Sequence, residues 1–246
     1  MKILATYNIK GGVGKTTSAV NLAFLAARDG HRTLVWDLDP QGAASFYFRV
    51  KPKIKGGVDS VLKGRTQLDD AVKATDFDGL DLLPSDFSFR NLDLAVNDSK
   101  QPMRQLLKLL RPLSHEYDML FIDCAPSISI VSENIFFAAD ALLVPIIPTP
   151  LSVRTYEQIL AYFDKSASKH LKILPFFSMV DRSRPLHKDL VDNLSKQYRE
   201  ILGTAIPQTK SIEMMGIHRA PVGHFAPESA SAQTYEKLWR EMQAKL

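Results

Sequence analysis

The sequence predicts an α/β fold, in which a single doubly wound and mainly parallel sheet is covered by helices on both faces. Short apolar runs alternate with helix-forming segments along the 246 residues of the chain. Strands that alternate with helices are typical of parallel βαβ units. The run at 119–123 is apolar up to its last residue, as in a strand buried on both faces. Because the length fits one large domain, we expect residues 1–246 to form a single domain.

The individual elements follow from apolar runs, helix formers and breakers taken in chain order. Apolar runs predict strands at 2–9, 33–38, 80–83, 119–123, 141–147, 171–180 and 204–207. Helix formers predict helices at 18–28, 59–63, 68–73, 101–111, 129–139, 152–168, 186–201 and 230–244. We expect Asp59 and Ser152 to cap the helices that they begin. In the last helix, a stripe at helical spacing predicts core packing by Tyr235, Leu238, Trp239 and Met242.

A glycine-rich stretch, Lys-Gly-Gly-Val-Gly-Lys-Thr-Thr at residues 10–17, lies between the first predicted strand and the first predicted helix. Glycines let the backbone approach a phosphate without a Cβ in the way. The helix N-terminus adds free N–H groups and a partial positive charge. This context is typical of a phosphate-binding loop. We therefore expect Lys15 to reach the β- and γ-phosphates of a nucleotide, and the Thr16 hydroxyl to ligate Mg²⁺.

Three carboxylates come at or just after the ends of apolar runs. Asp37 and Asp39 close the run at 33–38, and alternation predicts that both lie on one face of that strand. Asp123 closes the run at 119–123, which is the Walker B arrangement for holding Mg²⁺ through water. Ligands of open α/β sheets gather at the carboxyl ends of strands, so we expect these side chains beside the phosphate loop.

The phosphate loop departs from the general motif in a way that resembles a known family. Ile9 stands where the motif has its first glycine, and Lys10 adds a second lysine. This pattern resembles the deviant Walker A loop of the ParA/MinD superfamily of partitioning and positioning ATPases, in its ParA type. The strings Asp-Leu-Asp-Pro-Gln at 37–41 and Asp-Cys-Ala-Pro-Ser at 123–127 are similar to the same family.

This resemblance implies roles for residues of the site. Lys10 would contact the nucleotide of a partner subunit, and Asp39 would position the attacking water, with Asp37 near the Mg²⁺. The loops after Asp39 and Asp123 would act as first and second switches. The catalytic residues are then Lys10, Lys15 and Asp39, and the metal-binding residues are Thr16, Asp39 and Asp123. The nucleotide-binding residues, including an adenine pocket at the late strands, are Lys10, Gly11, Gly12, Val13, Gly14, Lys15, Thr16, Thr17, Met179, Asp181, Pro207 and Thr209.

The resemblance also implies a function. ATP and Mg²⁺ would be the cofactors, and two ATP molecules would be sandwiched in a homodimer. The ATP-bound dimer would bind non-specific DNA in the cytoplasm, on the nucleoid. Slow hydrolysis, stimulated by an activating partner protein, would release the dimer. The cycle would position or segregate a cargo such as a plasmid, a chromosome region or a protein complex.

The distribution of charge supports a polyanion partner. The net charge is +4, yet residues 165–246 hold 13 Lys and Arg against 8 Asp and Glu. A basic C-terminal third favours DNA, although a solvated surface explains the same composition. The family places DNA contacts in this third, and the candidates are Arg182, Arg184, Lys188, Lys196, Arg199 and Arg219. A second basic segment, 51–57 (Lys-Pro-Lys-Ile-Lys-Gly-Gly), predicts an exposed connection, with contact to a partner left open.

Three other classes of protein remain to be weighed. A MinD-like membrane-associated ATPase would add a C-terminal amphipathic anchor, whereas the tail here has the spacing of a packed stripe. An electron carrier with a shared iron–sulfur cluster would need two cysteines per subunit, and Cys124 is the single cysteine. An ATP-dependent metabolic ligase of the same fold stays open. We expect neither a signal peptide nor a membrane span, because no apolar run approaches the ~20 residues that a span requires.

Overall fold

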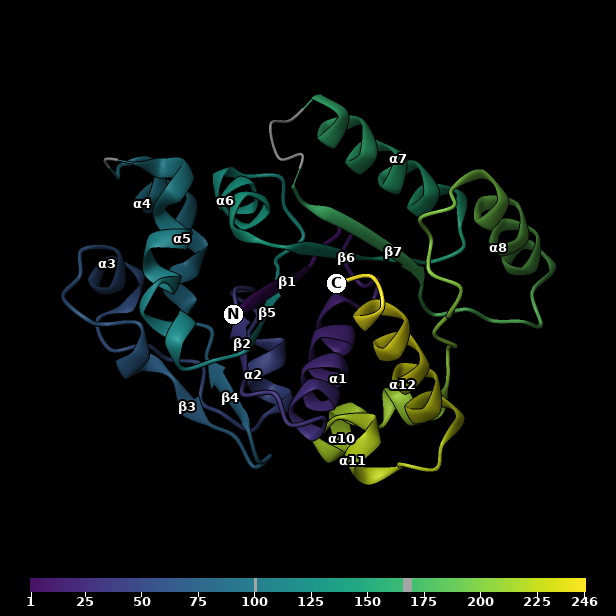
Figure 1. Ribbon diagram of the computed structural model, residues 1–246, viewed down its shortest axis with the longest axis horizontal. Coiled ribbons are helices and arrows are strands. Elements are labelled where there is room, and N and C mark those ends of the chain that lie inside the picture. Colours follow the sequence, from purple (N-terminus) through teal and green to yellow (C-terminus); the bar gives the residue numbers. More distant parts are fainter. Residues whose placement is uncertain (100, 166–169) are drawn as a thin grey trace.

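A seven-stranded sheet forms the centre of the molecule, in a computed structural model that describes residues 1–99, 101–165 and 170–246. Figure 1 shows the strands running through the middle, with helices on either side. The strand order is β3-β4-β2-β5-β1-β6-β7, and every pair is parallel except β3 with β4. The bounds are β1 Lys2–Thr6, β2 Thr33–Asp37, β3 Lys73–Ala74, β4 Leu80–Leu83, β5 Met119–Asp123, β6 Ala141–Ile146 and β7 Lys172–Phe177. The predicted doubly wound, mainly parallel sheet is confirmed.

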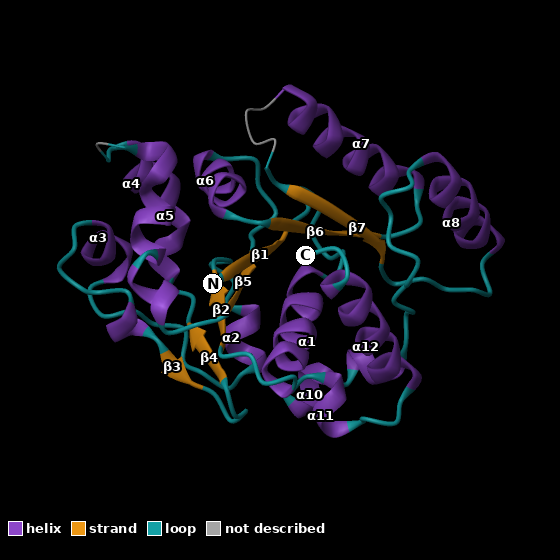
Figure 2. Cartoon of the chain, viewed as in Figure 1, coloured by secondary structure: helices purple, strands orange, loops and turns teal. Residues whose placement is uncertain are grey.

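Helices cover both faces of this sheet, as Figure 2 shows. The α-helices are α1 Lys15–Arg28, α2 Ala43–Tyr47, α3 Gly57–Leu62, α4 Leu92–Asn97, α5 Gln105–Leu110, α6 Ile130–Ala138, α7 Pro150–Lys165, α8 Pro185–Gln197, α9 Lys210–Glu213, α10 Met215–His218, α11 Val222–Phe225 and α12 Ala230–Gln243. Short 3₁₀ turns are η1 Asp69–Ala71, η2 Phe87–Asn91, η3 Pro102–Arg104 and η4 Pro112–His115.

Alternation along the strands divides the core into two layers. Leu34 and Trp36 of β2 belong to the core layer that also holds buried residues of α3 to α8, whereas Val35 belongs to the layer formed with α1, α2 and α10 to α12. On β5 the same alternation places Leu120 in the first layer and Phe121 in the second. Because both faces are covered, the central strands are apolar at nearly every position, and the polar residues that remain gather at the strand ends.

The C-terminal helix α12 closes the face that α1 covers. Its stripe of Tyr235, Leu238, Trp239 and Met242 is buried, as predicted. The indole Nε1 of Trp239 donates a hydrogen bond of 2.7 Å to Asp29 at the end of α1. Helices that are 200 residues apart in the sequence are therefore neighbours in the fold, and α12 helps to position the helix that begins at the phosphate loop.

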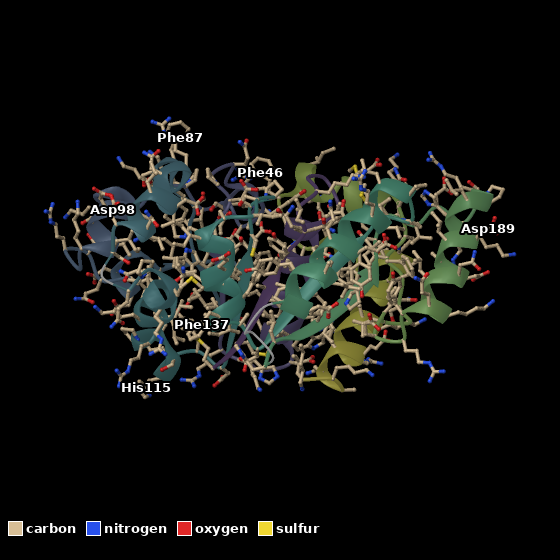
Figure 3. The ribbon with its side chains drawn as sticks, turned by 90° about the horizontal axis from the view of Figure 1, so that it is seen from above. Phe46, Phe87, Asp98, His115, Phe137 and Asp189 are labelled. Carbon is tan, nitrogen blue, oxygen red and sulfur yellow. The ribbon has the colours of Figure 1, made fainter. Side chains whose placement is uncertain are left out.

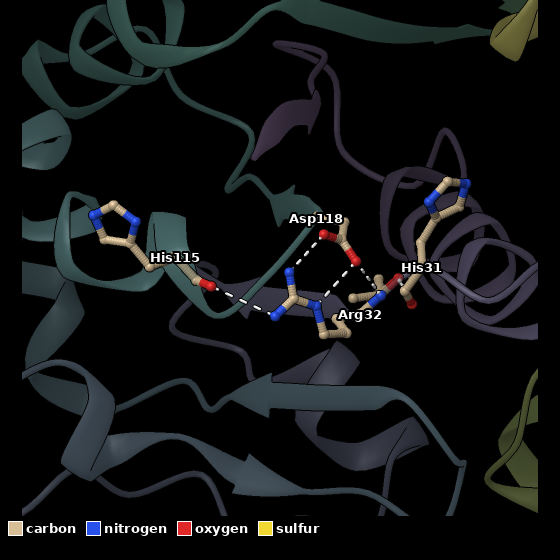
Figure 4. A network of polar contacts seen from close by, with 5 residues as sticks. His31, Arg32, His115 and Asp118 are labelled. Atoms are coloured by element: carbon tan, nitrogen blue, oxygen red, sulfur yellow. Dashed lines mark hydrogen bonds and ion pairs between the residues drawn. The ribbon is translucent and has the colours of Figure 1, made fainter.

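A polar network ties β2 to β5 at the N-terminal ends of the two strands, away from the phosphate loop (Figure 4). The guanidinium of Arg32 donates to both oxygens of the Asp118 carboxylate, at 2.7 and 3.1 Å, and to the carbonyl of His115 at 3.4 Å. These bonds hold the pKa of Asp118 well below its usual range, because hydrogen bonds from the Arg32 side chain and backbone stabilise the charged form. The residues before β2 and β5 are thereby locked together.

Several predicted elements differ from the structure. The strand predicted at 204–207 is reduced to an isolated bridge between Val180 and Pro207, because Pro207 has no N–H with which to extend a ladder. The helix predicted at 68–73 is the three-residue turn η1 followed by β3. The predicted helix at 152–168 begins at Pro150 and is described to Lys165, and its last three positions lie outside the described residues.

The two predicted caps are wrong for separate reasons. Asp59 lies in the first turn of α3, whose N-cap is Gly56, and its carboxylate pairs with Lys63 one turn later. Ser152 lies inside α7, where its hydroxyl accepts a hydrogen bond from the backbone N–H of Ile147. By contrast, Ser129 caps α6 with a reciprocal pair of bonds to Ser132.

The helices were also compared with the length and apolarity that a bilayer requires. Within the described ranges, none is both long and apolar enough to cross a membrane.

Candidate nucleotide-binding site

The phosphate loop joins β1 to α1 in a left-handed backbone that needs glycine. Gly12 and Gly14 have φ angles of 69° and 93°, and Gly14 is the N-cap of α1. A Cβ on Gly14 would lie only 2.8 Å from the hydroxyl oxygen of Ser178, which follows β7. The loop is therefore pressed against the end of β7, and glycine is required there by both conformation and space.

Lys15 lies at the start of α1 with its side chain buried. Burial lowers its pKa, and the nearby carboxylates of Asp123 and Asp39 act in the opposite direction. Its Nζ donates a hydrogen bond of 3.2 Å to the carbonyl of Lys10, so the side chain folds back across its own loop. An ammonium held in this position is the group that contacts the phosphates of a nucleotide in phosphate-loop proteins.

Two buried carboxylates end neighbouring strands in register. Asp37 of β2 pairs with Asp123 of β5, which in turn pairs with Thr6 of β1. One oxygen of Asp37 accepts two bonds of 2.7 Å from the N–H and hydroxyl of Ser45. One oxygen of Asp123 accepts a 3.4 Å bond from Thr6. In the part of the chain that the structure describes, the second oxygen of each carboxylate has no hydrogen-bond partner.

The electrostatics of this pair call for a cation. Burial raises the pKa of Asp123, and the adjacent Asp37 raises it further, while the hydroxyl of Thr16 acts in the opposite direction. Burial likewise raises the pKa of Asp37. Unpartnered buried carboxylate oxygens beside a threonine hydroxyl form a donor set that suits Mg²⁺, a hard cation that prefers oxygen ligands. Thr16 and Asp123 would hold the ion, which would neutralise phosphate charge when bound.

Asp39 lies beyond the last residue of β2, in the turn that leads to α2. This differs from the prediction that Asp37 and Asp39 share one strand face: the strand stops at Asp37, whose carboxylate is directed at Ser45 instead. The carboxylate of Asp39 accepts a bond from the N–H of Gln41, and its carbonyl accepts one from Ser85. Asp39 lines the cavity, so its carboxylate can orient a water molecule there.

A cavity of about 350 Å³ opens next to the phosphate loop. Its volume is within the usual range for small-molecule sites. Ten residues of the predicted site line it, namely Gly11, Gly12, Gly14, Lys15, Thr16, Thr17, Asp39, Met179, Pro207 and Thr209. Met179 has a φ of 55°, a left-handed conformation that is uncommon for a residue with a side chain. The phosphate loop and the segments after β7 thus form the two ends of one cavity.

Four residues predicted to take part do not line this cavity among the described residues. Val13 is fully buried beneath the loop, and Asp123 is buried below Thr16. The Asp181 carboxylate is instead engaged by Ser183 and by Arg184, at 3.0 Å from the Nε of Arg184. The carbonyl of Lys10 accepts the bond from Lys15, its N–H donates to the side chain of Asn8 at 2.9 Å, and the residue is half-buried.

Sequence reasoning missed part of the lining, namely Ala43, Tyr47, Pro126, Ser178, Ile206, Gln208, Ile212, Glu213 and Tyr235. Tyr47 belongs to α2, and Ile212 and Glu213 belong to α9, two short helices with no clear sequence signal. The helical stripe correctly identified Tyr235 as buried, but a stripe cannot tell that one of its edges borders a cavity. Only Pro126 had a usable signal, since it lies in the second switch string.

The basic candidates for DNA contact lie apart from the cavity. Arg182, Arg184, Lys188, Lys196 and Arg199 are exposed in or beside α8. Arg219 behaves differently. Its guanidinium stacks over the ring of Phe46 at 4.7 Å, and its Nε donates to the carbonyl of Phe46 at 3.0 Å. Arg219 is therefore tied to α2, and Arg184 is paired with Asp181, whereas Lys188 and Lys196 of α8 have no ion-pair partner among the described residues.

These features define a P-loop nucleotide-binding protein of the doubly wound α/β class. Residues 1–174 match a family model described as "AAA domain". The sporulation initiation inhibitor protein Soj of Bacillus subtilis is 28% identical over 250 residues, with 99% of this chain and 98% of that protein covered. The chain belongs to the family that this model describes, and it is a ParA-type partitioning ATPase of the ParA/MinD superfamily.

Another relative agrees with this assignment, and a solved structure shares the fold. The chromosome partitioning protein ParA of Caulobacter vibrioides is 28% identical over 251 residues, with 98% of this chain and 94% of that protein covered. A complex of an McdA variant from Cyanothece with ATP has the same fold, with a TM-score of 0.86 at 20% identity, over 99% of this chain and 96% of that one.

A third solved structure contains both cofactors. Cobyrinic acid a,c-diamide synthase from Mycobacterium smegmatis, with an ATP analogue and magnesium bound, has a TM-score of 0.82 at 26% identity, over 98% of this chain and 93% of that one. The nucleotide and metal in that structure are of the kind that the donor set of Lys15, Thr16 and Asp123 suits.

Proposed function

We propose that this chain is an ATP-switched positioning protein. In this cycle, Mg²⁺ and ATP bind at the phosphate loop and two subunits then close on two nucleotides. The resulting dimer binds DNA without regard to sequence, on the nucleoid in the cytoplasm. An activating partner protein stimulates hydrolysis, which releases the dimer. The cycle positions or segregates a plasmid, a chromosome region or a protein complex.

The observation that supports the dimer is a set of exposed apolar side chains, most of them at the end of the sheet where the phosphate loop lies, here called the apolar face. Phe46, Phe87, Ile128, Leu151 and Ile217 are between 48% and 73% exposed. The first four follow the carboxyl ends of strands, where the cavity also opens. In Figure 3, Phe46 and Phe87 project from one edge of the molecule and His115 from the opposite edge. Large apolar side chains gathered on one face are typical of a protein interface.

Lys10 gives this face a chemical purpose. Its side chain does not line the cavity of its own subunit, although Lys10 comes directly before the glycines of the loop. A second subunit facing the first would receive this ammonium from across the interface. There it would stabilise charge that develops on the γ-phosphate, as an arginine finger does. Dimerisation would therefore complete each catalytic site.

The basic residues of α8 support DNA binding in the ATP state. Lys188 and Lys196 are exposed, and neither has an ion-pair partner among the described residues. Their side chains suit phosphate contacts, which carry no sequence information. Because a dimer doubles these contacts, avidity links DNA affinity to ATP.

Two other functions are less well supported. A membrane-anchored variant of the cycle would need a free amphipathic helix, whereas the apolar stripe of α12 is buried against the core. The second of these functions is that of an ATP-dependent ligase, and the observation in its support is the likeness to the diamide synthase. DNA binding that depends on ATP would distinguish the partitioning cycle from a ligase.

The test of the proposal is Lys10→Ala. We expect this variant to bind ATP with normal affinity, because Lys10 is outside its own cavity, and to lose ATP-dependent dimerisation. Light scattering with ATP and Mg²⁺ measures the dimer, and calorimetry measures the affinity. Lys15→Ala is the control, since it should lose ATP binding altogether. A Lys10→Ala dimer of normal stability would contradict the proposed interface.

A further inference from the structure

Asn8 is a fully buried polar residue between β1 and the phosphate loop. The residue is 0% exposed, and it lies two positions after the last residue of β1 and two positions before Lys10. Burying an amide costs free energy unless its donor and acceptor groups find partners. Sequence reasoning gave Asn8 no role in the site, so its partners in the fold indicate what it does.

One end of the Asn8 amide takes the place of a strand partner. β1 pairs with the neighbouring strand β6 as far as Thr6 with Leu143, and the N–H of Tyr7 donates to the carbonyl of Leu143 at 2.9 Å. Beyond this point the chain leaves the sheet to form the loop. The Nδ2 of Asn8 donates at 2.9 Å to the carbonyl of Pro145, two residues further along β6. Since proline has no N–H, this carbonyl is the one backbone group of Pro145 that needs a partner.

The other end of the amide holds the backbone of Lys10. The Oδ1 of Asn8 accepts a hydrogen bond of 2.9 Å from the N–H of Lys10. Such a bond, from a side chain to the backbone two residues later, forms a local turn. The carbonyl of Lys10 accepts the 3.2 Å bond from Lys15. In the described part of the chain, the side chains of Asn8 and Lys15 thus supply the hydrogen bonds of the Lys10 backbone.

The two partners of Asn8 call for an amide at this position. The carbonyl of Pro145 can only accept a hydrogen bond and the N–H of Lys10 can only donate one, so the group between them must donate at one end and accept at the other. An aspartate would direct a carboxylate oxygen at the carbonyl of Pro145. A serine hydroxyl is shorter, and it can make only the local bond to the N–H of Lys10.

These bonds fix the direction in which the Lys10 side chain leaves the backbone. A planar peptide has only two soft dihedrals per residue, and both backbone groups of Lys10 are held. When the ammonium of Lys15 contacts phosphate, the carbonyl of Lys10 loses that partner, and the bond from Asn8 remains. A lysine whose backbone is fixed in advance loses less entropy when its ammonium is placed on a ligand. Asn8 therefore prepares Lys10 for a contact outside its own cavity.

We propose that Asn8 is a positioning residue, which directs Lys10 toward the nucleotide of the second subunit. The inference rests on the proposed function, because it requires Lys10 to act across the dimer. Asn8 itself contacts neither nucleotide nor metal in this scheme. It joins the backbone of Lys10 to β6, so the sheet holds this lysine in place and the loop does not have to do so alone.

The test compares Asn8→Ala with the wild type and with Lys10→Ala. Light scattering over a range of protein concentrations, with ATP and Mg²⁺, measures dimerisation, and calorimetry with ADP measures nucleotide affinity apart from dimerisation. We expect Asn8→Ala to weaken dimerisation about tenfold, as when a buried hydrogen bond is lost, and to change ADP affinity less than about twofold. A role limited to the stability of the loop would lower both quantities together, because Lys15 and the glycines belong to the same loop.

Asn8→Ser is the conservative variant, and Asn134→Ala is the matched control. Because the serine hydroxyl can still accept from the N–H of Lys10, Asn8→Ser should recover most of the dimerisation. Asn134 of α6 is also buried, and it donates to the carbonyl of Ile130 at 2.8 Å and accepts from the N–H of Gln105 at 3.1 Å. Asn134→Ala should therefore unfold at lower urea, as Asn8→Ala does, while its dimerisation stays normal.

The possible results separate the inference from the proposed function. Normal dimerisation of Asn8→Ala beside a defective Lys10→Ala would overturn the inference alone. Equal losses of ADP affinity and dimerisation would assign Asn8 to the whole loop and overturn it as well. An Asn8→Ser variant that dimerises no better than Asn8→Ala, or failure of both Asn8 variants to fold, would have the same consequence. Normal dimerisation of Lys10→Ala would instead count against the proposed function.

Discussion

Asp123 illustrates how a single residue combines structural cost with function. Its side chain is fully buried, one carboxylate oxygen lacks a hydrogen-bond partner among the described residues, and Asp37 lies next to it. Such a pair destabilises the protein unless a cation neutralises it. The same features make this position suitable for Mg²⁺. The carboxylate of Asp123 therefore affects both the free energy of unfolding without ligand and the affinity for the metal.

We expect Asp123→Asn to stabilise the protein without nucleotide by about 1–3 kcal/mol, because an amide removes the buried charge and can donate to Asp37. The variant should also lose the dependence of ATP binding on Mg²⁺. Urea unfolding without nucleotide measures the first effect, and calorimetry with and without Mg²⁺ measures the second. If the variant keeps normal Mg²⁺ dependence, Asp123 does not hold the ion.

Asp39, another single residue of the site, has a different role from Asp123, because its position beyond β2 leaves its carboxylate at the cavity wall. We expect Asp39→Ala to bind ATP and remain dimeric while hydrolysis falls by about two to four orders of magnitude, as when a group that positions a reactant is lost. Single-turnover phosphate release measures this. A loss of ATP binding instead would identify Asp39 as mainly a metal ligand.

At the scale of elements, Arg32 and Asp118 join the start of β2 to the start of β5. The pKa of Asp118 is lowered in the folded protein, chiefly by hydrogen bonds from Arg32. A carboxylate with a lowered folded pKa stabilises the fold above its unfolded pKa of about 3.9, and that contribution is lost as the pH falls further.

We therefore expect Arg32→Ala to unfold at lower urea than the wild type at pH 7, and to approach the wild type as the pH falls below about 4. Lys63→Ala, which breaks an exposed pair within α3, is the control and should change little at either pH. If the difference in urea unfolding between Arg32→Ala and the wild type persists unchanged at low pH, packing by Arg32, and not the ion pair, stabilises the N-terminal ends of these strands.

At the scale of the whole molecule, the phosphate loop, the apolar face and α8 have to act together. Nucleotide brings two subunits together, and the dimer then presents two copies of α8 to one duplex. We expect Lys188→Glu/Lys196→Glu to lower the affinity of the ATP-bound dimer for unrelated duplexes alike, and to flatten its dependence on salt. Filter binding over a range of salt measures both effects. A selective loss for one duplex sequence would contradict phosphate-directed binding.

The sequence alone predicted the parts of the site that are continuous in the chain. The glycine-rich stretch joins β1 to α1 where expected, and Asp37 and Asp123 end adjacent buried strands. These features depend on short-range physics: glycine conformation, the free N–H groups of a helix start, and the alternation of side chains along a strand. The same reasoning predicted the helix at 129–139, which is α6, and the buried stripe of α12.

Only the tertiary structure decided which distant segments meet. Ser178 approaches Gly14, and Tyr47 and Tyr235 join the cavity wall from α2 and α12. Two further outcomes also depend on contacts between distant segments. Arg219 binds the carbonyl of Phe46, and the predicted strand at 204–207 is only an isolated bridge. These outcomes depend on packing between segments that are far apart in the chain. No local pattern encodes such packing, because it is set by the balance of burial and hydrogen bonding over the whole fold.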